Sequence, residues 1–124
     1  MSAHPANFSQ KTLGGSRTGL GEWLLQRLTA LYISAFVVYL VMRFSVAPIV
    51  EFMEWQLWFA SGAVRVSWGL FFASALVHAW IGLRSVYLDY VRPLWLRFTA
   101  LTLTGTALLA LALWTAQFLL EVSP

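Results

Sequence analysis

One histidine, His78, stands within a long apolar stretch, and an acid and a phenol, Asp89 and Tyr90, follow soon after that stretch ends. Asp89 comes eleven positions after His78, a spacing that brings two helical side chains to nearly the same face, about 16 Å apart along the axis. Imidazole, carboxylate and phenol groups can ligate a metal, transfer protons or hydrogen-bond a polar ligand. Small and polar residues continue the same face: Ser67, Ser74, Gly82 and Ser85.

His78 allows three interpretations. Neutral imidazole binds haem iron well, and Gly82, one turn later, leaves space for a large flat group. The alternatives are a structural histidine that hydrogen-bonds a neighbouring helix and a proton relay from His78 to Asp89. The absence of an acid near His78 on this face counts against the relay. The only other histidine, His4, lies in the polar N-terminal segment. A second axial imidazole must therefore come from another chain, in a hetero-oligomer or a symmetric dimer.

The composition predicts that these residues belong to a membrane protein. Hydrophobic residues make up 60% of the 124-residue chain and charged residues only 10%, against about a quarter in soluble domains. So few charges cannot cover a surface in water, so lipid must cover part of it. The chain has no cysteine, which excludes thiolate ligation of a metal or an iron–sulfur cluster. We interpret the net charge of +3 as a topology signal and not as a nucleic-acid footprint.

An all-α fold with three transmembrane helices is predicted. Three apolar runs approach the length that spans a bilayer, and bracketing arginines together with Pro93 set their ends. The expected helices cover about residues 22–46, 64–90 and 97–120, preceded by a polar segment over residues 1–21. The intervening segment 49–62 mixes carboxylates with tryptophans, which suits the headgroup region. It predicts a short interfacial helix, with an irregular loop as the alternative.

The basic residues predict the orientation. Six lie in the N-terminal flank and in the loop between the second and third spans, and two lie on the opposite side. Because cytoplasmic loops carry the excess of Lys and Arg, the N-terminus and this loop are expected on the cytoplasmic or matrix side. The six are Lys11, Arg17, Arg27, Arg84, Arg92 and Arg97, and the two are Arg43 and Arg65.

Tyr90, Asp89 and Arg27 are expected at this same membrane face, with Arg27 and Tyr90 at similar depth. A tyrosine hydroxyl can donate a hydrogen bond to a quinone carbonyl, and an arginine can donate or raise the local potential. Tyrosine and arginine are also routine anchors at membrane interfaces. The residues alone therefore leave a quinone site and ordinary anchoring both open.

Several segments resemble the hydrophobic membrane anchors of succinate dehydrogenase (respiratory complex II). The most specific is the spacing from the histidine of His78-Ala79-Trp80-Ile81-Gly82-Leu83 to Asp89-Tyr90-Val91. The upstream Gln26-Arg27-Leu28-Thr29-Ala30 and the closing Arg92-Pro93-Leu94-Trp95-Leu96-Arg97 are also similar. The resemblance covers about residues 20 to 120.

This resemblance implies a three-helix anchor that pairs with a second three-helix anchor, the cytochrome b anchor, around one haem b. His78 then matches the axial ligand, and Arg27 the arginine near the haem propionates and quinone pocket. Tyr90 matches the tyrosine that hydrogen-bonds ubiquinone, and Asp89 the acid beside it. The iron–sulfur and flavoprotein subunits would dock on the cytoplasmic face.

The expected function is thus the membrane anchor of succinate:quinone oxidoreductase, in a bacterial or mitochondrial inner membrane. As a non-flavin member of that complex, the chain would take part in the respiratory chain and the tricarboxylic acid cycle without performing succinate chemistry itself. The alternatives are part of a small proton-coupled transporter or channel, which uses His78 and Asp89 as a relay, and a structural anchor without a cofactor.

Overall fold

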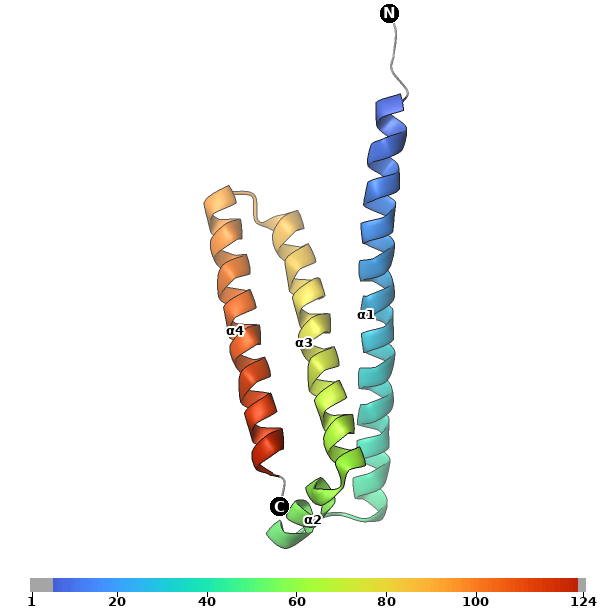
Figure 1. Cartoon of the computed structure of the whole chain (residues 1–124), viewed down its shortest axis with the longest axis vertical. Helices are drawn as coiled ribbons and strands as arrows, with labels where there is room; N and C mark the ends of the chain where they lie inside the picture. Colours follow the sequence, from blue (N-terminus) through green and yellow to red (C-terminus); the bar gives the residue numbers. More distant parts are fainter. Residues whose placement is uncertain (1–5, 123–124) are drawn as a thin grey trace, which may run out of the picture.

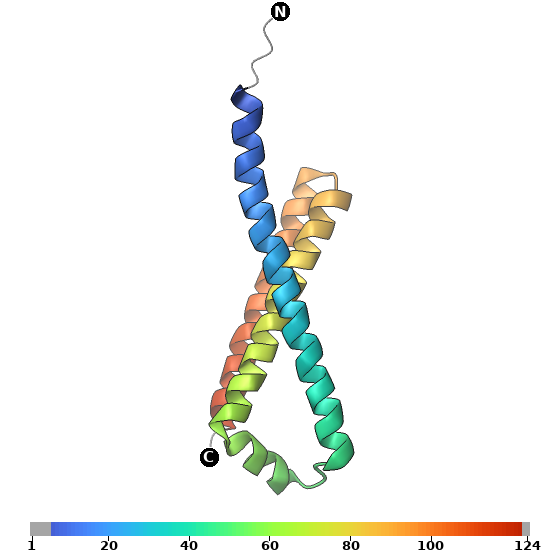
Figure 2. The same ribbon diagram turned by 90° about the vertical axis from the view of Figure 1, so that its right-hand side faces the viewer.

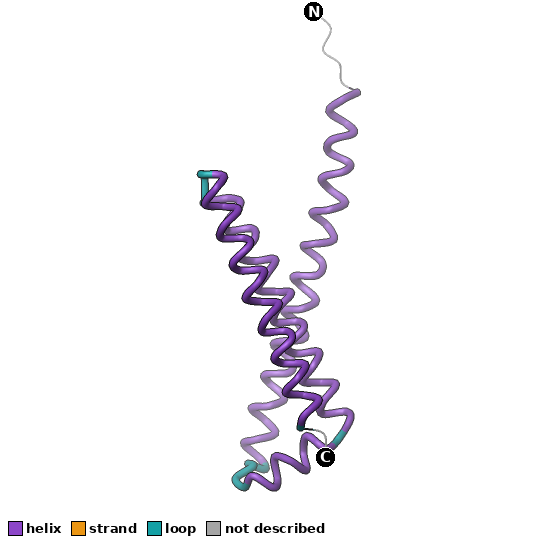
Figure 3. The backbone as a smooth tube through the Cα atoms, turned by 60° about the vertical axis from the view of Figure 1, so that its left-hand side comes forward, coloured by secondary structure: helices purple, strands orange, loops and turns teal. Residues whose placement is uncertain are grey.

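The computed structural model describes residues 6–122, with side chains described from residue 19 onward. Residues 1–5, which include His4, lie outside the described range. The described chain forms four helices: α1 (Ala6–Val46), α2 (Phe52–Ala60), α3 (Gly62–Tyr90) and α4 (Leu94–Glu121). Figure 1 shows the three long helices side by side, with α3 in the middle and the short α2 across one end. Figure 3 shows that the connections between the helices are short loops at the two ends of the bundle.

Three helices are long and apolar enough to cross a membrane, over Gly19–Val46, Gly62–Tyr90 and Leu94–Glu121. The predicted all-α fold with three spans is therefore confirmed. The helix that contains the first span extends upstream of it and begins at Ala6, within the predicted polar segment 1–21. No proline follows Pro5 until Pro48. The glycines upstream of the span lower helix propensity by only about 1 kcal/mol each, so the helix continues through them.

The turn between α3 and α4 is fixed by a proline and an arginine. α3 ends at Tyr90, as the position of Pro93 predicts, and Pro93 itself is the N-cap of α4. The Arg97 guanidinium donates from Nε to the carbonyl of Val91 at 3.0 Å and from a terminal nitrogen to the carbonyl of Leu88 at 3.3 Å. These bonds satisfy carbonyls that the end of α3 leaves without helical partners.

The segment between α1 and α3 contains a helix, as predicted, and not an irregular loop. The Glu54 carboxylate accepts hydrogen bonds from the backbone amides of Val50 at 3.0 Å and Glu51 at 3.3 Å, at the start of α2. These two bonds lower the pKa of the Glu54 carboxyl below its ordinary value. Elsewhere on α2, Phe59 is buried and its ring lies 5.9 Å from that of Trp68 on α3.

The core of the single chain is small. Figure 2 shows α1 crossing α3 and diverging from it towards both ends. Among the described side chains, only Phe36, Phe59 and Thr29 are less than 9% exposed, and many large apolar side chains lie on the outside. Within residues 6–122, α3 contacts each of the other helices, whereas α1 and α4 do not contact each other. Such a surface is suited to lipid and to further protein subunits.

Candidate functional site

His78 lies on the face of α3 that packs against α1. Its ring is partly buried, and each ring nitrogen faces a polar side chain of α1. Nδ1 lies 3.2 Å from Oγ1 of Thr29, and Nε2 lies 3.5 Å from the side-chain nitrogen of Gln26. The polar stripe along α3 therefore faces protein at this level, as its composition predicts. Farther along the stripe, Ser85 and Asp89 are exposed.

Thr29 and Gln26 are site residues that were not singled out from the sequence. They lie three positions apart on α1, a spacing that places two side chains on one helix face. Thr29 is 7% exposed, and its hydroxyl also lies 2.8 Å from the carbonyl oxygen of Leu25. The carbonyl oxygen of the Gln26 side chain is buried and has no hydrogen-bond partner in the described part of this chain. A polar pair at this spacing is the signal that could have identified them.

The space expected beside Gly82 is not open in the single chain. A Cβ placed on Gly82 would lie 3.6 Å from the side-chain nitrogen of Gln26. The Gln26 amide thus fills the position that was expected to hold a flat group, because a side chain from the neighbouring helix can enter the gap that a glycine leaves. A planar ligand at Nε2 of His78 requires this amide to move aside.

Glu22 and Arg84 form an ion pair between α1 and α3. The side chain of Arg84 is 39% exposed and that of Glu22 is 37% exposed, so the pair lies at the edge of the bundle. From the sequence, Arg84 was recognised only as a topology signal. The pair fixes the register between the two helices, since it places Glu22 opposite Arg84 while Thr29 lies opposite His78.

This register contradicts the predicted depth match between Arg27 and Tyr90. Arg27 lies five residues into the span from Glu22, whereas Tyr90 lies six residues from Arg84 in the opposite direction. Their backbones are therefore separated by roughly 16 Å along the helices. Arg27 is level with the His78 site, because its neighbour Gln26 contacts His78. The prediction took depth from the ends of the apolar runs, and an arginine inside a span breaks that assumption.

Among the described residues, no side-chain hydrogen bond or ion pair joins Arg27, Asp89 and Tyr90 to one another. The Arg27 guanidinium lies 5.4 Å from the centre of the Trp23 ring. Asp89 is exposed, and the Tyr90 side chain is 80% exposed. The neighbouring Tyr87, by contrast, is partly buried and its hydroxyl lies 2.9 Å from that of Thr104 on α4. Tyr87 therefore joins α3 to α4, while Tyr90 is exposed at the end of α3.

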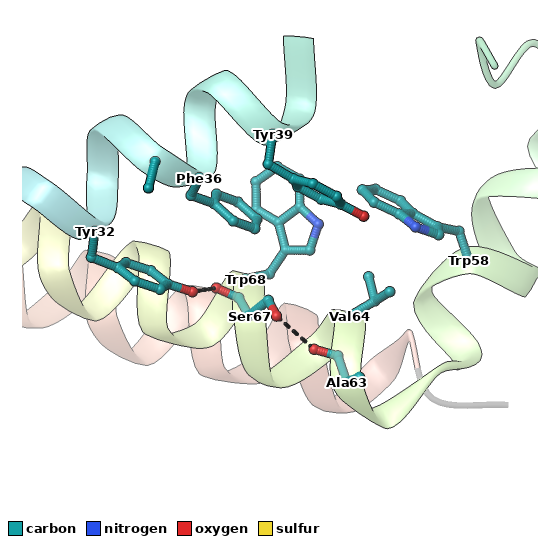
Figure 4. Close-up of a pocket in the computed structure, with 9 residues that line it drawn as sticks. Tyr32, Phe36, Tyr39, Trp58, Ala63, Val64, Ser67 and Trp68 are labelled. Atoms are coloured by element: carbon teal, nitrogen blue, oxygen red, sulfur yellow. Dashed lines mark hydrogen bonds between the residues drawn. The ribbon is translucent and has the colours of Figure 1, made fainter. Parts of the chain in front are cut away.

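A hollow of about 370 Å³ lies between α1 and α3 near α2. Figure 4 shows the aromatic side chains of Tyr32, Phe36 and Tyr39 on one wall and Trp58 at one end. The Tyr32 hydroxyl donates to the carbonyl oxygen of Ser67 at 2.8 Å. This hollow was not predicted from the sequence, because aromatic residues at helical spacing ordinarily form packing contacts.

No group of three or more histidine, cysteine or acidic side chains capable of holding a metal gathers in the described part of the chain. His78 is the one imidazole within that part. Its two ring nitrogens differ in their surroundings, with a hydroxyl at one and an amide at the other. The described residues therefore supply a single imidazole at an interhelical face.

These features define a multi-pass helical membrane protein with a histidine between its first two spans. The chain matches no protein-family model. It is similar to the succinate dehydrogenase hydrophobic membrane anchor subunit of Coxiella burnetii, with 29% identity over 104 residues that cover 84% of this chain and 90% of that relative. The resemblance to the succinate dehydrogenase membrane anchors is thereby confirmed.

Proposed function

We propose that this chain is the hydrophobic membrane anchor of a succinate:quinone oxidoreductase. The observation that carries the proposal is the similarity to an anchor subunit along most of both chains, together with three apolar helices of spanning length. Succinate oxidation takes place in the flavoprotein subunit of such an enzyme, and the iron–sulfur subunit passes the electrons on. The anchor holds both at the inner membrane, with its N-terminus and its α3–α4 turn on their side.

In this function His78 is one axial ligand of a haem b, which transfers one electron at a time when bound. The residues present fit this group. His78 supplies the imidazole. The buried side-chain oxygen of Gln26 has no hydrogen-bond partner among the described residues, so a further group is needed to satisfy it. Arg27, whose neighbour Gln26 contacts His78, attracts a haem propionate in this proposal. The second axial histidine belongs to the partner anchor, the cytochrome b anchor.

Tyr90 and Asp89 contribute to the site where ubiquinone is reduced. The Tyr90 hydroxyl donates a hydrogen bond to a quinone carbonyl oxygen, and the neighbouring carboxylate supports the uptake of protons. The 80% exposure of Tyr90 in the single chain agrees with a pocket completed by other subunits. The register favours a role of Arg27 at the haem over a direct contact with the quinone, because Arg27 and Tyr90 are separated by roughly 16 Å along the helices.

The contacts of His78 also favour a second candidate, an anchor in which this histidine has only a structural role. A neutral imidazole hydrogen-bonded to Thr29 stabilises the pairing of α1 with α3 whether or not a haem binds. In that case His78→Leu weakens the assembly but removes no pigment.

The absorption spectrum of the purified complex distinguishes the two candidates. The haem assignment predicts that His78→Leu alters or abolishes the reduced-minus-oxidised b-type band and the low-spin haem EPR signal. Protein content, measured on the same samples, controls for lost assembly. An unchanged spectrum and EPR signal per assembled complex would rule out the ligand role. Quinone reduction is not the deciding assay, since haem can lie on a side branch of the electron path.

A further inference from the structure

The hydroxyl of Thr29 has one proton and lies near two carbonyl oxygens and one imidazole nitrogen. Its oxygen lies 2.8 Å from the carbonyl oxygen of Leu25, 3.1 Å from that of Gln26 and 3.2 Å from Nδ1 of His78. The shortest distance has the usual length of a hydroxyl hydrogen bond. A threonine within a helix commonly donates to the carbonyl four residues earlier. The proton therefore points to Leu25, and a lone pair of the oxygen faces His78.

This arrangement indicates which ring nitrogen of His78 carries its proton. An oxygen lone pair can face Nδ1 at hydrogen-bond distance only if Nδ1 donates, and a neutral imidazole has one N–H. Nε2 must then be unprotonated. With Nε2 unprotonated, the Gln26 side-chain nitrogen, which is a donor, can face it at 3.5 Å.

We propose that Thr29 is a positioning residue that accepts a hydrogen bond from Nδ1–H of His78 and so presents the Nε2 lone pair to the haem iron. The proposal rests on the proposed haem-ligand function of His78. A second hydrogen bond at a ligating histidine fixes the tautomer and the ring plane, and it makes the imidazole a stronger electron donor. The burial of Thr29, which is 7% exposed, keeps water from competing for this bond.

Gln26 has a different part in the same arrangement. Its amide lies where a ligand of Nε2 would bind and close to Gly82, and its carbonyl oxygen gains no hydrogen bond from the described residues there. Displacing the amide therefore breaks only the 3.5 Å contact between Gln26 and Nε2. The hydrogen bond between Thr29 and Nδ1 is kept. The His78 ring therefore keeps its orientation when Nε2 becomes free to bind a ligand.

Three variants of the complete complex test the proposal. Thr29→Val keeps the shape but removes the acceptor, and Thr29→Ser restores it. Thr115→Val is the matched control, because the Thr115 hydroxyl also donates to the carbonyl four residues earlier, at 2.7 Å, but has no contact with His78. We expect Thr29→Val to lower haem affinity by about 10- to 100-fold, as measured by haem content at limiting haem supply.

The haem redox potential gives a readout that a merely packing role would not change. Loss of the hydrogen bond weakens electron donation by the imidazole. The equilibrium between oxidised and reduced haem should therefore shift towards the reduced form by up to about tenfold. A tenfold change in a one-electron equilibrium corresponds to about 59 mV upward in midpoint potential. Thr29→Ser and Thr115→Val should keep the wild-type potential. A Thr29→Val complex that matches Thr115→Val in both potential and haem content would overturn the proposal.

Nitrogen NMR of the histidine-labelled full chain in lipid nanodiscs covers the case in which Thr29→Val does not assemble. The proposal requires the proton on Nδ1 of His78 in the wild-type chain without haem, and a proton on Nε2 refutes it. Failure of the underlying function looks different. An unchanged haem spectrum in His78→Leu removes the ligand role itself, whereas a lost spectrum with the wrong tautomer removes only the role of Thr29.

Discussion

Tyr90→Phe removes one hydroxyl from the exposed end of α3 and should separate quinone chemistry from folding. The Tyr90 side chain is 80% exposed. Substitutions at such surface positions usually change the free energy of unfolding by less than about 0.5 kcal/mol. The variant anchor should therefore insert and assemble like the wild-type protein.

The size of the effect on quinone reduction follows from the type of bond that is lost. The quinone oxygen becomes more negative as electrons arrive, so the bond from the phenol strengthens towards the transition state and raises turnover. A hydrogen bond to a charged group contributes about 1.5–3 kcal/mol. Roughly 1.4 kcal/mol of transition-state stabilisation is a factor of ten. Tyr90→Phe should thus slow ubiquinone reduction by roughly ten- to hundredfold.

The assay compares two activities in the same membranes: succinate oxidation with ubiquinone, and succinate oxidation with an artificial dye that accepts electrons upstream. Tyr87→Phe is the matched control, because it lies one turn earlier and its hydroxyl bonds to Thr104 at 2.9 Å. The control should lose about 0.5–1.5 kcal/mol of stability, and its two activities should fall together with the amount of complex.

Two results would refute the reasoning on Tyr90. If both activities of Tyr90→Phe fall in proportion, Tyr90 supports assembly and not quinone reduction. If neither activity falls, Tyr90 is an interfacial anchor and the quinone assignment is wrong.

Three further predictions concern the helices that position the site. Glu22 and Arg84 should show a coupling of about 0.2–1 kcal/mol in a double-mutant cycle of complex stability with glutamine at each position, and because the pair is partly exposed this coupling should shrink as salt is raised. Gly105→Ala should be tolerated, because its Cβ would meet the Trp80 ring at an ordinary 3.5 Å, whereas Gly105→Leu should overpack the α3–α4 contact and cost about 1–3 kcal/mol in the thermal unfolding of the complex. The pKa of Glu54 is lower in the folded chain, so its ionised form stabilises the start of α2 at neutral pH, and this stabilisation is lost as pH falls through the lowered value. Hydrogen-exchange protection of the Val50 and Glu51 amides should decrease over that acid range, and Glu54→Ala should lack this protection at every pH.

The helices could be predicted from the sequence because their signals are local. Apolar length identified the spans, Pro93 marked the end of α3, and the mixture of carboxylates and tryptophans identified α2 as a short helix. The start of α1 was misplaced because polarity was used as a boundary. A polar segment without proline can continue a helix. Its polarity marks the end of the membrane span and not the end of the helix.

The face of α3 that carries His78 was also predictable, since periodicity along one helix defines a stripe. The side chains that contact His78 could not be predicted. A stripe does not say which helix covers it or at what register, and the contacts of His78 with Thr29 and Gln26 depend on both. The same missing register led to the incorrect depth for Arg27. The Glu22–Arg84 pair supplies that register, but two opposite charges far apart in a sequence do not identify each other as partners.

The order of contacts along the chain has a consequence for biosynthesis. Within residues 6–122 each long helix packs on a long helix next to it in sequence, α1 on α3 and α3 on α4, and α4 does not return to α1. During membrane insertion α3 can therefore pack on α1, and α4 on α3, in the order in which the spans are synthesised. The His78 contacts with Thr29 and Gln26 involve no residue of α4. Within the described residues, α1 and α4, the two long helices farthest apart in sequence, need not meet for this packing to form.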